Sequence, residues 1–138
     1  MDDVTLTRTL CAALGALPGW EFREKGPAYP ATVVGVFYGT LKDSPDRAAA
    51  VQLYSPTDED HLAIRRAQVI VRGRKGDRYD ADRLAGHVFL ALHRLSRVGG
   101  ISDIRRISGG PLGADNNGRE ERSDNYQITL NNPEASSP

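Results

Sequence analysis

AIRRAQVIVRG, at residues 63–73, is followed by DADRLAGHVFLALHRL at residues 80–95, and these two stretches decide the fold. In the first stretch Ala67, Val69 and Val71 alternate with Arg66, Gln68 and Arg72, which is the two-residue period of a half-buried strand. In the second stretch the apolar residues recur at the spacing of a helix that buries one face, and they are Leu84, Val88, Leu92 and Leu95. Asp80 is the predicted N-cap of this helix, and Gly99-Gly100 follows its end.

The rest of the chain predicts one more helix and four more strands. Residues 4–17 carry a leucine every third or fourth position, with Asp2, Asp3 or Thr5 available as a cap. Strands are predicted at residues 33–40, 47–55, 101–110 and 119–130, where Tyr126, Ile128 and Leu130 alternate toward the core. Turns are predicted at residues 42–46, 56–60 and 111–118. Residues 20–32 are predicted to form an ordered loop, with Trp20 and Phe22 held against the core.

The predicted order is therefore α-β-β-β-α-β-β. Consecutive strands combined with two helices are typical of the α+β type of α/β protein. We expect a mostly antiparallel sheet with both helices packed on one face.

Length and composition indicate one compact unit. The chain has 138 residues, with 18 basic and 18 acidic side chains that cancel. We expect a single domain over residues 1–132 and a flexible tail over residues 133–138. The single cysteine, Cys11, lies in an apolar pattern and is expected to be buried. The first ten residues do not resemble a signal peptide, and no apolar run is long enough to cross a bilayer, so we expect no membrane contact and folding in the cytoplasm.

No motif supports catalysis or a cofactor. Residues 123–125 spell Ser-Asp-Asn, as in penicillin-binding enzymes, but no serine stands three residues before a lysine and no Lys-Thr-Gly follows. His87 and His93 point to different sides of the predicted helix and cannot share a metal ion. The acidic run after Asp115 does not have the spacing of a calcium loop. We expect no catalytic residue, no metal and no cofactor.

Arginines are the most conspicuous charged residues, and several lie on or beside the predicted strands. If the helices cover one face of the sheet, outward-pointing arginines decorate the other face. A solvated face, phosphate contacts with DNA and pairing with a neighbouring subunit all remain open for them. The mixed charges that begin at Arg119 favour a subunit interface, because pairing of opposite signs gives specificity. The predicted interface residues are Arg65, Arg66, Arg72, Arg105, Arg106, Arg119, Glu120, Glu121, Arg122 and Asp124.

Three long stretches of the sequence resemble a known family. LTRTLCAALGALPGW at residues 6–20, VGVFYGTLKDSPDRAAAVQLY at residues 34–54, and the segment from Arg97 to Glu134 resemble the tail-terminator or minor capsid proteins of phages, particularly of actinobacterial hosts. The resemblance covers the chain to about Pro133. It lies in recurring sequence patterns, and it transfers no residue-level functional motif.

The resemblance implies a structural virion protein that forms a ring, usually six-fold. Such a ring caps the tail tube and joins it to the head-side connector, and the genome passes through its lumen. Its partners would be other copies of itself, the tube protein, the connector or stopper protein and, transiently, genome DNA. It would assemble in the bacterial host cytoplasm and reside in the neck of the virion. The alternatives are another neck protein, such as a stopper or adaptor, and a small nucleic-acid-binding module that uses an arginine-bearing sheet face.

Overall fold

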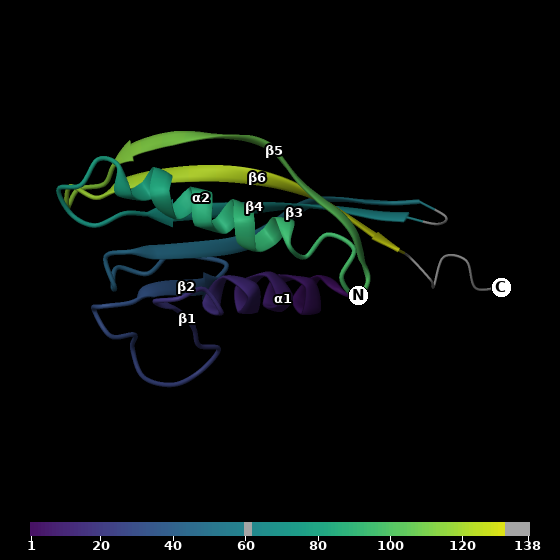
Figure 1. Cartoon of the computed structure of the whole chain (residues 1–138), viewed down its shortest axis with the longest axis horizontal. Coiled ribbons are helices and arrows are strands. Elements are labelled where there is room, and N and C mark those ends of the chain that lie inside the picture. The colour runs from purple at the N-terminus through teal and green to yellow at the C-terminus, as the bar shows by residue number, and fades with distance from the viewer. Residues whose placement is uncertain (60–61, 132–138) are drawn as a thin grey trace.

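The computed structural model of the chain describes residues 1–59 and 62–131 (Figure 1). The predicted tail at residues 133–138 lies outside the described residues. The elements in chain order are α1 (Asp3–Gly15), β1 (Trp20–Phe22), β2 (Val34–Tyr38), β3 (Ala48–Asp58), β4 (Leu62–Arg72), α2 (Asp80–His93), β5 (Ile101–Ala114) and β6 (Glu120–Asn131). No helix in the described ranges is long and apolar enough to cross a membrane.

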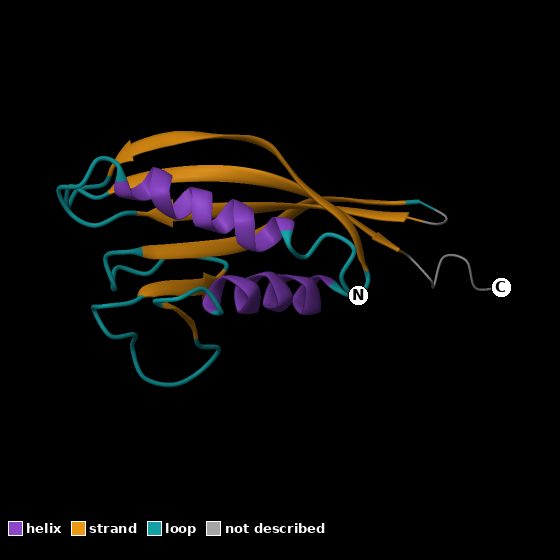
Figure 2. Ribbon diagram, in the orientation of Figure 1, coloured by secondary structure: helices purple, strands orange, loops and turns teal. Residues whose placement is uncertain are grey.

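All six strands join one sheet in the order β1-β2-β3-β4-β6-β5. Three of its five strand pairings are antiparallel, namely β3 with β4, β4 with β6, and β5 with β6. Both helices lie on the same face of this sheet (Figure 2). The predicted α+β class, the mostly antiparallel sheet and the one-sided helix layer are therefore confirmed.

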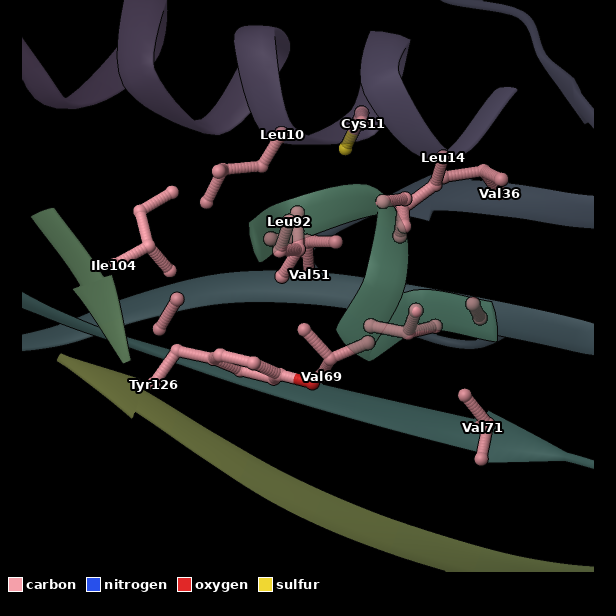
Figure 3. Close-up of a cluster of buried hydrophobic side chains, with 14 of the residues drawn as sticks. Leu10, Cys11, Leu14, Val36, Val51, Val69, Val71, Leu92, Ile104 and Tyr126 are labelled. Carbon is pink, nitrogen blue, oxygen red and sulfur yellow. The ribbon is translucent and has the colours of Figure 1, made fainter. Parts of the chain in front are cut away.

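The core lies between the helices and the covered face of the sheet. Leu10 and Leu14 of α1 and Leu92 of α2 point toward Val51 and Val69 of the central strands (Figure 3). The predicted alternation is confirmed, because Ala67, Val69 and Val71 on β4, and Tyr126, Ile128 and Leu130 on β6, are all buried in this core. Cys11 is buried there too, as expected.

The loop prediction for residues 20–32 is wrong at its start. Trp20–Phe22 forms the edge strand β1, parallel to β2. Gly19 adopts a φ of +82° that reverses the chain after α1, and its carbonyl accepts a hydrogen bond from the Val34 N–H at 3.0 Å. Trp20 is buried and Phe22 packs against the core, so the expectation that both side chains are held there is confirmed.

Strands β2 and β3 are parallel neighbours, although only residues 39–47 connect them and no helix does so. The connection crosses the face of the sheet opposite the helices. There Pro45 lies directly over Gly35, and a Cβ built on Gly35 would come within 2.9 Å of the Pro45 Cδ. Glycine at position 35 is therefore what lets so short a parallel connection pass.

Several predicted boundaries are wrong because strands run on into the predicted turns. β3 extends to Asp58 past a bulge between Tyr54 and Thr57, and β5 extends to Ala114. Asp80 is not the N-cap of α2. Tyr79 is the cap residue and makes no side-chain cap bond, whereas Asp80 is buried at the first position of the helix. On α1 the cap is Asp2, whose carboxylate accepts from the Thr5 N–H at 2.7 Å.

Candidate functional site

Two of the predicted interface arginines are buried within the chain and hold its loops. Arg119, 3 % exposed, donates to the carboxylates of Asp115, Asp43 and Asp46 at 2.8–3.0 Å. Arg72, 4 % exposed, donates to the backbone carbonyls of Lys42, Pro45 and Asp46 at 2.7–2.8 Å. Together they clamp the connection between β2 and β3 onto the ends of β4 and β6.

The clamp shifts the pKa values of the side chains that form it. The Arg119 N–H bonded to the Asp115 carboxylate, with further bonds from the Arg119 side chain and the Asp115 turn, lowers the pKa of Asp115 to about 2. Burial opposes the charge on Arg119, but its bonds to Asp115, Asp43 and Asp46 outweigh burial and raise the pKa of its guanidinium. Burial, and then the nearby charge of Arg119, lower the pKa of Arg72. The carbonyls and carboxylates around these two arginines are therefore already paired with guanidinium groups of the same chain.

Three more predicted residues meet under α2 on the helix-covered face. The carboxylate of Asp124, 2 % exposed, lies 3.0 Å from the Arg122 Nε and 3.7 Å from the NH1 of Arg106. Arg122 also reaches Asp82 of α2 at 3.2 Å, and the Arg106 guanidinium lies 4.6 Å from the centroid of the Phe89 ring. These charges bind α2 to β5 and β6.

The strand backbone makes room for this cluster. A Cβ built on Gly109 of β5 would overlap the Oδ1 of Asp124, so only glycine fits beside the buried carboxylate. Burial, and then the charge of Asp124, raise the pKa of the neighbouring Tyr126 hydroxyl to about 12. The hydroxyl therefore stays protonated at neutral pH.

Arg65 also faces the helices. Its Nε donates to Asp3 at the start of α1 and its NH1 donates to Asp58 near the end of β3, both at 2.7 Å. These bonds, led by the one to Asp3, raise the pKa of Arg65. The side chain therefore braces the outer part of the β3–β4 hairpin against α1.

The uncovered face of the sheet carries a neutral ladder of hydrogen-bonded side chains. Gln52 bonds Gln68 at 2.8 Å, and Gln68 bonds Ser123 at 3.1 Å. Asn125 accepts from the Tyr54 hydroxyl at 2.9 Å and donates to Ser108 at 2.9 Å. Ser123 and Asn125 thus point away from Asp124, so the Ser-Asp-Asn motif is divided between two faces of one strand.

Of the predicted interface residues, four are not enclosed by the helix layer or the loop clamp. Arg66 donates to Gln127 at 3.4 Å on the uncovered face, and Arg105 pairs with Asp103 at 2.9 Å in an exposed position. Glu120 and Glu121 are half-buried at the start of β6. The expectation that outward arginines decorate the uncovered face holds for Arg66 and Arg105, and it is wrong for Arg65, Arg106 and Arg122. The alternation itself signals this, because Arg65 shares the parity of Ala67, and Arg122 and Asp124 share that of Tyr126.

A groove that was not predicted from the sequence lies at the ends of β1 and β2. A hollow of about 350 Å³ opens beside the N-terminal half of α1, and a second of about 370 Å³ adjoins it. They share Arg23, Glu24, Phe37 and Lys42. We call the pair of hollows the β1–β2 groove; the first is lined by Val4, Arg8, Phe22, Arg23, Glu24, Phe37, Tyr38 and Lys42. Its signal in the sequence is weak, because it forms between segments far apart along the chain.

The fold also has a projecting hairpin that was not predicted from the sequence. The outer parts of β3 and β4 extend past both helices (Figure 1). The last residues of β3 are exposed accordingly, whereas its first four are buried. We call the described part of this projection, residues 54–59 and 62–66, the hairpin arm. Within residues 1–59 and 62–131 there is no group of three or more metal-binding side chains.

The described part of the chain thus defines a small α+β domain whose buried charges hold its own loops and helix. The remaining features are surfaces, namely a groove, an arm and an uncovered sheet face, and such surfaces are typical of proteins that work by assembly. The family model described as bacteriophage tail terminator protein matches residues 16–132, and the chain belongs to that family. It is a structural phage tail protein and a component of the virion. No curated protein matches the chain.

Proposed function

We propose that this protein forms a six-fold ring that caps the completed tail tube and joins it to the head-side connector. The observation that carries the proposal is the tail-terminator match over residues 16–132. That match includes all six strands and α2, and therefore the whole sheet. Each subunit of a ring that ends a tube must contact other copies of itself laterally and two different partners axially.

The surfaces of the chain support such a division of contacts. One face of the sheet is covered by helices and the other is not, so the two faces offer different chemistry to neighbours. Arg66, Arg105, Glu120 and Glu121 remain candidates for contacts between subunits, because they lie outside the two internal clusters. The tube protein and a connector or stopper protein would bind at opposite ends of the ring, and genome DNA would pass through its lumen.

The nucleic-acid-binding alternative has less support. A sheet face that binds phosphates carries many cations that no carboxylate neutralises. Here the uncovered face bears mainly amide and hydroxyl groups, and Arg105 is paired with Asp103. A lumen wall of that kind would let DNA pass without holding it.

Negative-stain electron microscopy of the protein with and without tail tubes tests the proposal. The expected image is a ring of constant subunit number at one end of each tube. Sequence-independent DNA binding that falls steeply with salt, without any ring, would favour the nucleic-acid alternative instead. Tubes that stay uncapped at saturating protein would contradict the proposal.

A further inference from the structure

The hairpin arm is a projection with apolar and acidic groups toward the outer end of its described part. Leu62 is 38 % exposed, and Pro56, in the bulge farther back along the arm, is exposed as well. Glu59 adds a carboxylate that forms no ion pair among the described residues, whereas the carboxylate of Asp58 is already bound by Arg65 at 2.7 Å. Arg65 ties Asp58 to Asp3 of α1, which holds the arm in one direction.

The β1–β2 groove is complementary to the hairpin arm in shape and in charge. Its apolar lining includes Phe37, which is buried, and Tyr38 and Val4, which are 50 % and 47 % exposed. Its rim carries Lys42, and the second hollow adds Lys25; neither ammonium group has a carboxylate within 4.0 Å among the described residues. An apolar, concave floor with excess positive charge at the rim fits an apolar projection that carries carboxylates.

The walls of this groove are held in place before anything binds. The Tyr29 hydroxyl accepts from the Arg23 N–H at 2.8 Å and donates to the Val36 carbonyl at 2.6 Å. Its ring packs edge-on against Phe37, with 5.1 Å between centroids. On the other side, the Lys42 carbonyl is bound by Arg72 at 2.7 Å. A preformed groove loses little conformational entropy on binding.

The arm of a given chain does not enter the groove of that same chain, although Arg65 links Asp58 of the arm to Asp3, the residue before Val4 at the edge of the groove. Tyr38, in the groove, is paired with Val51 of β3. From Val51 the strand continues through the bulge between Tyr54 and Thr57 to Asp58, so the end of the arm lies farther along the strand direction, by at most about 20 Å. The arm also extends past the ends of both helices (Figure 1).

From these observations we infer that the hairpin arm of one copy binds in the β1–β2 groove of the next copy. This inference rests on the proposed ring, and it names the contact that joins neighbouring subunits. The contact is heterologous, because two different surfaces meet, and repeated heterologous contacts close into a ring when the rotation between copies permits. Glu59 would face Lys42, and Leu62 would cover Tyr38.

Disulfide trapping tests the contact with the substitutions Tyr38→Cys and Leu62→Cys. Under mild oxidation, an equimolar mixture of the two single variants should give a covalent dimer, and the chain with both changes should give a ladder of oligomers. Each single variant alone should give neither. The native Cys11 is not expected to interfere, because burial, aided by the charge of Glu24, raises the pKa of its thiol to about 12.

Charge reversal provides a second test that does not depend on the cysteine variants folding. Lys42→Glu or Glu59→Lys alone should weaken self-association roughly tenfold, and the two changes together should restore it. Lys75→Glu, an exposed change on the loop before α2, is the matched control and should have no effect. Circular dichroism of each variant checks that the fold is retained.

Electron microscopy of the same samples distinguishes failure of the contact from failure of the ring. Rings at tube ends, with no disulfide dimer and no effect of reversal, would overturn the arm-in-groove contact and leave the ring standing. Absence of both rings and covalent oligomers would overturn the proposed function together with the contact. A dimer in the mixture and restoration by the double reversal would support both.

Discussion

The guanidinium of Arg119 lies 3.0 Å from the carboxylate of Asp46, which precedes it by 73 residues in the chain. This bond, with those to Asp43 and Asp115, anchors the connection between β2 and β3 to the turn before β6. The parallel pairing of β2 and β3 depends on that short connection. The mixed charges of this region therefore serve the fold of the single chain, before any question of an interface arises.

Replacement of Arg119 by alanine is expected to destabilise the protein strongly. The change removes the buried guanidinium that joins Asp43, Asp46 and Asp115, and because these carboxylates remain in contact with solvent, the loss of its charged hydrogen bonds should cost about 1–3 kcal/mol. Arg105→Ala is the matched control, because its pair with Asp103 is exposed and should contribute less than about 1 kcal/mol. Urea unfolding followed by circular dichroism measures both. Equal losses in the two variants would contradict the clamp.

Stability is expected to fall in acid because of Asp115. Its pKa is about 2 in the folded protein, against an ordinary value of 3.8 that the unfolded chain retains. A carboxylate with a lowered folded pKa contributes stability above its unfolded pKa, and the contribution is lost as pH falls from about 4 to about 2. Thermal melts of the wild type and Asp115→Asn should differ at pH 6 and converge as pH falls to about 2. A gap that stays constant with pH would show that another interaction stabilises this turn.

Two adjacent glycines of β5 should respond differently to substitution. Gly109→Ala places a methyl group against the buried Asp124 carboxylate and should cost about 1–3 kcal/mol. Gly110→Ala serves as the control, because a Cβ there meets no atom within 4 Å. Melting temperatures of the two variants provide the comparison, and a smaller loss for Gly109→Ala than for Gly110→Ala would refute the close approach.

Two aspartates in the first turn of α2 provide a further comparison between a buried and an exposed substitution. Asp80, with a side chain only 1 % exposed, accepts from Arg47 at 2.8 Å and from the Arg74 N–H at 2.8 Å. Asp80→Ala should therefore cost about 3 kcal/mol, because it leaves these donors unpaired. Asp82, in the same turn, is 64 % exposed and pairs with Arg122, so Asp82→Ala should cost less than about 1 kcal/mol. Denaturant midpoints of the two variants test this difference.

Local pattern in the sequence determined the helices, the principal strands and which of their residues enter the core. Leu84, Val88 and Leu92 recur at helical spacing, and Ala67, Val69 and Val71 alternate, because one face of each element is buried. The same alternation places Arg65 and Arg122 on the helix-covered face. The resemblance to tail terminators likewise came from sequence, and the family match bears it out.

Only the tertiary structure decided which charged side chains pair with one another inside the chain and which surfaces remain free for partners. A two-residue period assigns a side chain to a face of the sheet, but it does not say what covers that face. Arg119 is buried because the parallel arrangement of β2 and β3 brings Asp43 and Asp46 to it, and that arrangement involves contacts far apart in sequence. The groove and the arm likewise depend on contacts between segments that are far apart in the sequence. The groove forms where β1 joins the edge of the sheet. The arm forms where β3 and β4 extend past the ends of the two helices.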